Sequence, residues 1–284
     1  MKIKEKLTYH FLLIFKSFLS RIGTNNRLWI ATILSNFIYY LIPVRKKVSK
    51  KNLKIAFPLL QDKELNKIVQ KTYKFFVHNL IEFCAFTTSI NEIKLEIKGE
   101  KYIEKALKKS NGLILVSGHF GSWEVLGNWI GKNFPLFTGV AIKQKNLGAH
   151  KFFLEQRELS GTRHIFKKDS INKMYDVLSQ NGILGLVSDQ DAKRNGVFVD
   201  FFGKKASTPK GAALFHINKD SPIIVALCNQ INYKNYKINF IPVNTLDKGV
   251  QEITQTYTKI LEENIIKNPE QYFWFHRRWK TKHE

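Results

Sequence analysis

The sequence feature that most constrains the fold is an alternation of two apolar patterns from residue 95 onward. Short apolar segments rich in β-branched residues indicate buried strands, and the segments between them repeat apolar residues every three or four positions, as helices do. Strands alternating with helices are typical of an α/β fold with a helix-covered sheet. The strand-like segments are LEIKG (95–99), GLILVSG (112–118), FTGVAIK (137–143), GILGLVSD (182–189), PIIVALCNQI (222–231) and KINFIPV (237–243), and the helix-like ones are YIEKALKKS (102–110), INKMYDVLSQ (171–180) and TQTYTKILEENIIKN (254–268).

The 284 residues, 44% of them hydrophobic, suffice for one large domain with its own core. No internal repeat or low-complexity linker interrupts residues 45–284, so we predict a single domain there. It begins with a basic amphipathic helix at 45–58, which ends at Pro58, and a long helix at 62–86. Residues 1–44 are predicted to form a separate, membrane-associated helical segment.

The stretch LWIATILSNFIYYLIPV (28–44) carries no charge and predicts a hydrophobic helix. A helix of that length covers roughly 25 Å, slightly less than a hydrocarbon core of ~30 Å, and Asn36 lies in its middle. It either spans a membrane or lies in the interface, and a buried core helix is the alternative. The basic cluster after residue 44 places the main domain on the cytoplasmic side. The first 23 residues contain no small-residue cleavage site typical of a removable signal peptide.

The chain has 46 Lys and Arg against 23 Asp and Glu, a formal net charge of +23. Such an excess predicts an acidic partner: nucleic acid, anionic lipid or an acidic carrier protein. Zinc-finger spacing and RNA-binding signatures are lacking, and aromatic residues are interleaved with the basic ones, which favours the membrane over nucleic acid. Cys84 and Cys228 lie far apart in apolar segments, which indicates buried free thiols in a reducing compartment.

The segment SGHFGSWEVLGNWI (117–130) is the candidate reaction centre. A strand at 113–117, a turn with two glycines and a helix from about Ser122 would place His119 in the loop and Glu124 in the first helical turn. Glu124 could then reach one imidazole nitrogen and raise the basicity of the other, which would take a proton from a hydroxyl. The alternative is a loop histidine beside a glutamate that only stabilises the helix dipole. We expect no metal and no cofactor, since no second His or Cys stands at ligand spacing, and no serine nucleophile, since no G-x-S-x-G turn occurs.

His119-Phe-Gly-Ser-Trp-Glu124 resembles the H-x4-E motif of the bacterial lipid A biosynthesis late acyltransferases, the lauroyl and myristoyl transferase family. The resemblance covers nearly the whole chain in family order. The other segments that carry it are NLKIAFP (52–58), HNLIEF (78–83), DQD (189–191), VFVDFFGKKASTPKGAA (197–213) and PEQYFWFHRRWK (269–280). It implies a glycerolipid-acyltransferase-like mixed sheet flanked by helices, and acyl transfer without a covalent enzyme intermediate.

In that family His119 would act as the general base on an acceptor hydroxyl, which attacks the thioester of an acyl carrier protein, and Glu124 would orient His119. Lys143, in VAIKQKN, stands where the family tends to have an arginine, and it can meet a phosphate only as a point charge. Arg157 keeps its family counterpart and is expected to contact an anion, with an exposed helix charge as the alternative. Asp189 is expected in substrate positioning or in a structural loop.

Two further basic segments are candidates for substrate binding. In KKASTPKGAALF (204–215), Ser207 or Thr208 is a candidate N-cap with Pro209 opening a helix. Lys204, Lys205 and Lys210 would then surround a phosphate site at that N-terminus. Plain helix capping explains the same residues. In WFHRRWK (274–280), Arg277 and Arg278 lie between tryptophans, as at a headgroup interface, and a docked C-terminal tail is the alternative.

The sequence therefore predicts an acyltransferase at the cytoplasmic face of the bacterial inner membrane. It would move a fatty acyl chain from acyl carrier protein to a hydroxyl on an anionic lipid A precursor. Two alternatives remain: a related glycolipid acyltransferase of the mannoside type that uses acyl-coenzyme A, and a basic membrane-binding protein without chemistry.

Overall fold

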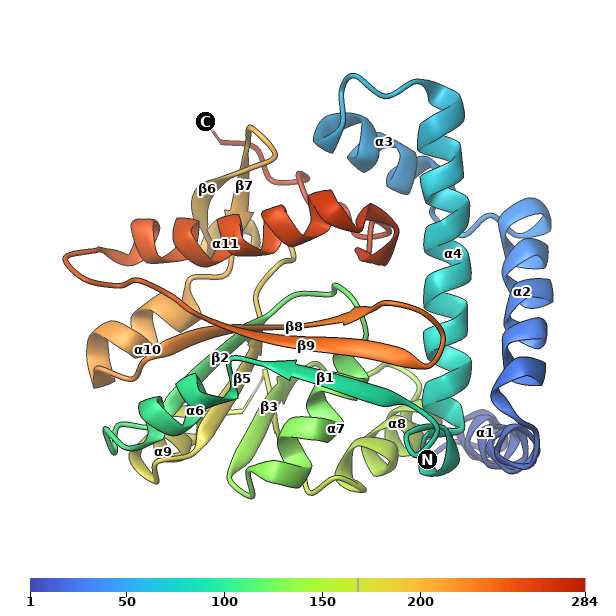
Figure 1. The fold of residues 1–284 in the computed structure, drawn as a ribbon, viewed down its shortest axis with the longest axis horizontal. Coiled ribbons are helices and arrows are strands. Elements are labelled where there is room, and N and C mark those ends of the chain that lie inside the picture. Colours follow the sequence, from blue (N-terminus) through green and yellow to red (C-terminus); the bar gives the residue numbers. More distant parts are fainter. Residues whose placement is uncertain (168, 284) are drawn as a thin grey trace.

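A computed structural model describes residues 1–167 and 169–283 and contains a seven-stranded sheet with the order β1-β9-β8-β2-β5-β3-β4 (Figure 1). All neighbouring strands are parallel except β8 and β9, which pair antiparallel. The predicted mixed α/β sheet flanked by helices is confirmed. The strands are β1 Lys94–Lys98, β2 Leu113–Ser117, β3 Phe137–Ala141, β4 Arg163–Phe166, β5 Ile183–Val187, β8 Ile223–Gln230 and β9 Asn235–Pro242.

The composition of each strand follows from its place in the sheet. The central strand β2 has no charged residue and is buried along its whole length, because helices cover both of its faces. The edge strand β1, KLEIK, turns its lysines and glutamate toward solvent in strict alternation, which suits an edge.

The sheet separates two apolar cores. Ile114 and Val116 of β2 contact one core, which contains side chains of α9, α10 and α11. Leu113 and Leu115 point to the opposite face and contact the other core, which contains side chains of α6 and α7. These helices are α6 Glu100–Leu107, α7 Trp123–Asn133, α9 Ile171–Ser179, α10 Gly211–Lys219 and α11 Val250–Lys267.

Residues 197–208 differ from the prediction. They form a small antiparallel sheet of β6 Val197–Phe201 and β7 Lys204–Thr208, which lies against α11 (Figure 1). Ser207 and Thr208 are strand residues rather than N-caps, and α10 begins only at Gly211. The helix-capping prediction was wrong because the hairpin pairs these residues with β6 before the chain turns into the helix.

Helices α1, α2, α3 and α4 stand at one end of the sheet (Figure 1). Helix α2 packs on α4, and α1 packs on α8. Gly148 of α8 lies so close to α1 that a side chain there would overlap the backbone of Glu5. The remaining helical segments are α1 Ile3–Arg21, α2 Thr24–Leu41, α3 Lys46–Ala56, α4 Asp62–Cys84, α5 Phe86–Ser89, α8 Leu147–Glu158, η1 Lys193–Asn195 and η2 Pro269–Gln271.

Residues 28–44 were predicted to form a hydrophobic helix that spans a membrane or lies in its interface, and the helices of the structure do not confirm a span. In residues 1–167 and 169–283, no single helix combines the length and apolar composition needed to cross a bilayer. Helices α2 and α3, bent by 92° at their junction, meet that criterion only as a pair.

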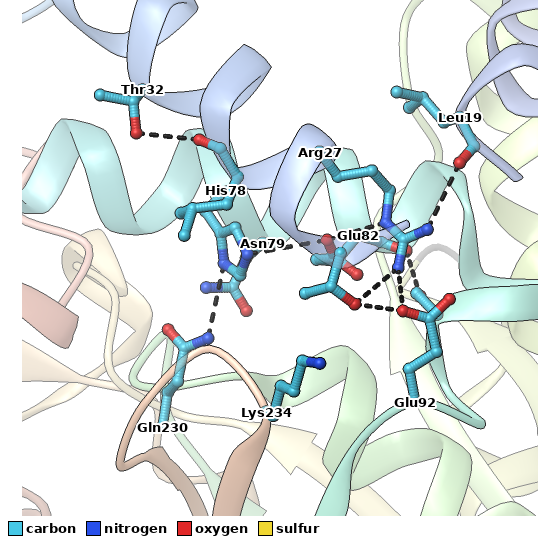
Figure 2. Close-up of polar contacts among 12 residues, drawn as sticks. Leu19, Arg27, Thr32, His78, Asn79, Glu82, Glu92, Gln230 and Lys234 are labelled. Carbon is cyan, nitrogen blue, oxygen red and sulfur yellow. Dashed lines mark hydrogen bonds and ion pairs between the residues drawn. The ribbon is translucent and has the colours of Figure 1, made fainter. Parts of the chain in front are cut away.

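A buried ion cluster fastens α2 to the rest of the protein (Figure 2). Arg27 of α2 is fully buried and pairs with Glu82 of α4 and with Glu92, each at 2.9 Å. Its Nη1 also donates to the carbonyl oxygens of Leu19 and Ile22 at the junction of α1 and α2. The guanidinium thus donates hydrogen bonds both to two carboxylates and to carbonyl oxygens at the end of a helix, which have no partner within the helix. This set of residues is called the Arg27 cluster below.

Candidate active site

The loop that carries His119 is held by backbone hydrogen bonds on both sides. The amide of Ser122 donates to the carbonyl of Cys228 at the end of β8, and the amide of Gly121 donates to Gln271. Gly121 has a φ of +63°, and a side chain there would overlap the carbonyl oxygen of Cys228. Only glycine allows this close approach, so the local sequence fixes the place of His119 at the carboxyl end of β2.

His119 is paired with Asp189. Its Nδ1 lies 2.8 Å from Oδ1 of Asp189, and since a carboxylate only accepts, Nδ1 carries the proton and donates. In the neutral ring Nε2 then carries the lone pair that can accept a proton. The Asp189 side chain is nearly fully buried, whereas the His119 side chain is 30% exposed, so solvent or a substrate can reach the imidazole but not the carboxylate.

The two residues meet because β2 and β5 are parallel neighbours. Ser117 pairs with Val187 at the carboxyl ends of these strands, and His119 and Asp189 each follow two residues later. Gln190 lies beside the ring as well: its amide Nε2 is 3.5 Å from Nε2 of His119, which can accept from it, and 3.3 Å from Nδ1, which is itself a donor in this tautomer.

The pair favours a charged imidazole next to a charged carboxylate. Burial lowers the pKa of His119, but the charge and hydrogen bond of Asp189, with a smaller contribution from Glu124, outweigh it, so this pKa lies above its ordinary value. Burial raises the pKa of Asp189, yet the charge and hydrogen bonds of His119 and the charge of Arg278 hold it below its ordinary value. His119 is therefore a stronger base than a free imidazole.

Glu124 does not contact His119 as expected. It forms a two-point ion pair with Arg157 of α8, with Nε–Oε2 and Nη2–Oε1 distances of 2.9 and 2.6 Å, and it accepts from Nε1 of Trp123. Within the described residues, the ring of His119 has hydrogen-bond partners in Asp189 and Gln190 only. The expectation that Glu124 orients the imidazole is corrected: that contact belongs to Asp189, and Arg157 meets an anion of the protein itself.

A cleft of about 280 Å³ lies beside the loop, between α4, α7 and α8. Five of its twelve lining residues are aromatic, and two of these, Trp123 and Phe273, contact the ring of His119 with centroid distances of 5.4 and 5.9 Å. The ion pair of Glu124 and Arg157 supplies charged groups to the same wall. The cleft can hold an apolar chain with a polar head group near the imidazole. Its lining residues are Phe76, Asn79, Leu80, Phe83, Gly121, Ser122, Trp123, Glu124, Gln144, Phe153, Arg157 and Phe273.

The remaining predicted substrate residues are not gathered at this cleft. Lys143 is exposed in the loop after β3, and its neighbour Gln144 lines the cleft instead. Lys204 and Lys205 are exposed on β7, where Lys205 pairs with Asp200 at 3.0 Å, and they surround no helix N-terminus. The phosphate site predicted there is therefore not formed.

The C-terminal segment is docked on the protein. Trp274 is fully buried, and the side-chain amide of Asn52 donates to its carbonyl at 2.7 Å. Arg277 is exposed, but Arg278 is 2% exposed, which excludes the predicted contact of Arg278 with lipid headgroups. The segment also reaches the site, since the amide of Phe273 donates to the carbonyl of His119.

Sequence reasoning missed the roles of Gln190 and Phe273 beside His119. Gln190 stands within DQD, directly after the strand-like segment 182–189, so the rule that reactive groups gather at carboxyl ends of strands could have found it. Phe273 had no comparable signal, because it reaches the imidazole through the fold of the C-terminal segment.

A family model described as bacterial lipid A biosynthesis acyltransferase matches residues 3–281. The lipid A biosynthesis palmitoleoyltransferase of Escherichia coli (strain K12) is 22% identical over 245 residues, which cover 84% of this chain and 79% of that protein. The lipid A biosynthesis lauroyltransferase of the same organism is 25% identical over 251 residues, covering 84% and 80%. The phosphatidylinositol mannoside acyltransferase of Mycobacterium tuberculosis (strain ATCC 25618 / H37Rv) is 26% identical over 188 residues, covering 64% and 59%. The resemblance read from the sequence motifs is thus confirmed, and the chain is an acyltransferase that belongs to the bacterial lipid A biosynthesis acyltransferase family.

Proposed function

We propose that this protein transfers a fatty acyl chain from acyl carrier protein to a hydroxyl of a lipid A precursor, with His119 as the general base. The observation that carries the proposal is the pairing of His119 with buried Asp189 beside an apolar cleft. Nε2 of His119 takes the hydroxyl proton while the oxygen attacks the thioester carbonyl carbon. The carbon–sulfur bond then breaks, and the thiolate leaves with the proton returned by the imidazolium.

The aromatic cleft suits the acyl chain of the donor. Phe83 of α4 and Phe153 of α8 stack with centroids 5.8 Å apart in its wall, and an alkyl chain buried against such rings gains roughly 0.8 kcal/mol per CH₂. Arg157 and Glu124 remain candidate contacts for the polar end of a substrate, because both line the cleft, where they pair with each other.

The excess of positive charge fits both substrates. Acyl carrier protein is acidic, and a lipid A precursor bears phosphates, so a net charge of +23 would speed encounter with either. Lys143, Lys204, Lys205 and Arg277 remain surface candidates for such long-range attraction rather than for contacts in the cleft.

We further propose attachment to the cytoplasmic face of the inner membrane through α1 and α2. One side of α1 exposes apolar side chains along its length, and α2 exposes a second set. Exposed apolar helix faces on a surface rich in lysine are typical of membrane-interacting proteins. The exposed residues of the two helices are Ile3, Leu7, Phe11, Ile14, Phe18, Trp29, Ile33, Leu34, Phe37, Tyr40 and Leu41.

The test is an assay of the purified protein with carrier-bound acyl chains and a lipid A precursor, read by mass spectrometry of the lipid product. The expected result is a lipid product heavier by one acyl chain. In His119→Ala the rate at which this product forms should fall by ~10²-fold or more. Lys105→Ala is the control, because that side chain is exposed on α6 and no residue of α6 lines the cleft. A normal product yield from His119→Ala would refute the assignment of the base.

The similarity to a phosphatidylinositol mannoside acyltransferase favours a second candidate, acyl transfer from acyl-coenzyme A to a mannoside glycolipid. The same assay separates the two. Product formed with the mannoside acceptor and acyl-coenzyme A, but not with the lipid A precursor, would select the second candidate.

A further inference from the structure

Arg278 is a buried cation that takes no part in the acyl-transfer steps proposed for His119. It follows η2 in the C-terminal segment and is 2% exposed. Nη1 donates to the carbonyl of Ser207 at 2.7 Å, Nη2 donates to the hydroxyl of Thr208, and the guanidinium lies over the ring of Phe201 at 5.1 Å. The β6–β7 hairpin therefore holds this side chain in one place, with its charge inside the protein.

The partners of Arg278 do not neutralise its charge. Its hydrogen bonds go to a carbonyl and a hydroxyl, and no carboxylate lies within ion-pair distance of it in residues 1–167 and 169–283. A buried charge without a close counterion is costly, so its retention calls for a function of the charge itself.

Arg278 shares an internal cavity with Asp189. The cavity measures about 10 Å³, and Ser117, two residues before His119, lines it as well. Nε of Arg278 and Oγ of Ser117 have no hydrogen-bond partner among the described residues. A cavity of this size accommodates one water molecule, which could accept from Nε and bond to Oγ. The guanidinium and the carboxylate thus face one small internal cavity whose other walls are largely apolar.

We propose that Arg278 is a positioning residue of the acyl-transfer site, which keeps Asp189 ionised from behind so that Asp189 can hold the imidazole of His119. The buried positive charge of Arg278 acts on the carboxylate through a region with little water, where charges are weakly screened. The small β6–β7 sheet then serves the reaction, since it fixes the cation that supports the pair. The kinetic part of this inference rests on the proposed role of His119 as the base.

The sign of the effect follows from electrostatics. A nearby positive charge disfavours protonation of both the carboxylate and the imidazole, so its removal raises the pKa of each. In Arg278→Met we expect the acid limb of the pH profile of kcat/KM to move upward by about one pH unit, which makes the reactive fraction on that limb roughly tenfold smaller. A residue that only braces the hairpin would lower the rate at every pH without moving the limb.

The experiment compares Arg278→Met with Arg277→Met, a neighbouring arginine that is exposed. The pH profile is measured with carrier-bound acyl donor, and the pKa of Asp189 is measured separately by carbon NMR of labelled aspartate in the full-length protein. We expect an upward shift of both in Arg278→Met and of neither in Arg277→Met. The NMR arm needs no turnover, so a shift of the Asp189 pKa without detectable acyl transfer would reject the proposed function and keep the electrostatic coupling.

The proposal is overturned if folded Arg278→Met keeps the wild-type acid limb of kcat/KM and the wild-type pKa of Asp189. If Arg278→Met alone does not fold, the double variant Arg278→Met/Asp189→Asn decides. Removal of the carboxylate that Arg278 supports should then restore part of the lost thermal stability. Strictly additive losses in the two single variants and the double variant would count against any coupling between these side chains.

Discussion

Replacement of Arg27 by methionine tests the Arg27 cluster. The substitution keeps an apolar stem of similar length but removes the buried charge that faces Glu82 and Glu92. Glu82 is the more costly residue to leave behind, because its side chain is only 13% exposed, against 32% for Glu92. The carbonyls of Leu19 and Ile22 lose a donor as well.

Breaking a buried ion pair in this way costs about 3 to 5 kcal/mol of unfolding free energy. For a chain of this size, roughly 2 °C of Tm per kcal/mol is the expected conversion, which predicts a fall of about 6 to 10 °C in a thermal scan. The double variant Arg27→Met/Glu82→Gln should recover part of that loss, since no buried charge is then left without a counterion.

The matched control is Lys50→Met, which breaks the surface pair of Lys50 with Asp62. That pair has a similar distance, 2.8 Å, but its side chains are 36% and 75% exposed. Exposed pairs contribute about 0 to 1 kcal/mol, so the control should shift Tm by under about 2 °C. Equal shifts in Arg27→Met and Lys50→Met would refute the reasoning that burial sets the cost.

Three further predictions concern the site. Gly121→Ala should cost several kcal/mol, because a methyl group would overlap the backbone at Cys228, whereas Gly127→Ala in α7 has open space and should stabilise by about 0.5 to 1 kcal/mol; chemical denaturation measures both. Arg157→Met leaves a carboxylate unpaired in the cleft and should lower kcat/KM by at least tenfold, while Lys143→Ala, which changes an exposed residue, should lower it less than threefold. Since the pKa of His119 lies above its ordinary value, kcat/KM should begin to fall, as the pH is lowered, at a pH above the ordinary histidine pKa, and an acid limb below that pKa would contradict the paired geometry.

The sheet and its major helices were predictable from apolar periodicity. Strand β2 and helix α4 coincide with segments whose patterns are long and consistent. The β6–β7 hairpin was not predictable in this way. Pro209 and the Ser-Thr pair before it form a strong helix-start signal, and the tertiary pairing of these residues with β6 overrode that signal. The burial of Arg278 was equally hidden, since an arginine beside tryptophans has the same sequence signature on a surface as in a docked tail.

The partner of His119 shows where sequence spacing stops being informative. Glu124 is the nearest carboxylate along the chain, and helical geometry allows it to turn toward the loop, so local reasoning selects it. Asp189 lies 70 residues away and becomes a neighbour only through the pairing of β2 with β5. Both candidates sit at the carboxyl end of the sheet, but Arg157 on α8 draws Glu124 away with a two-point ion pair and leaves Nδ1 of His119 to Asp189. The order of strands and the position of one arginine on a third element thus decide which carboxylate sets the tautomer of the imidazole, and neither is encoded in the spacing of the motif itself.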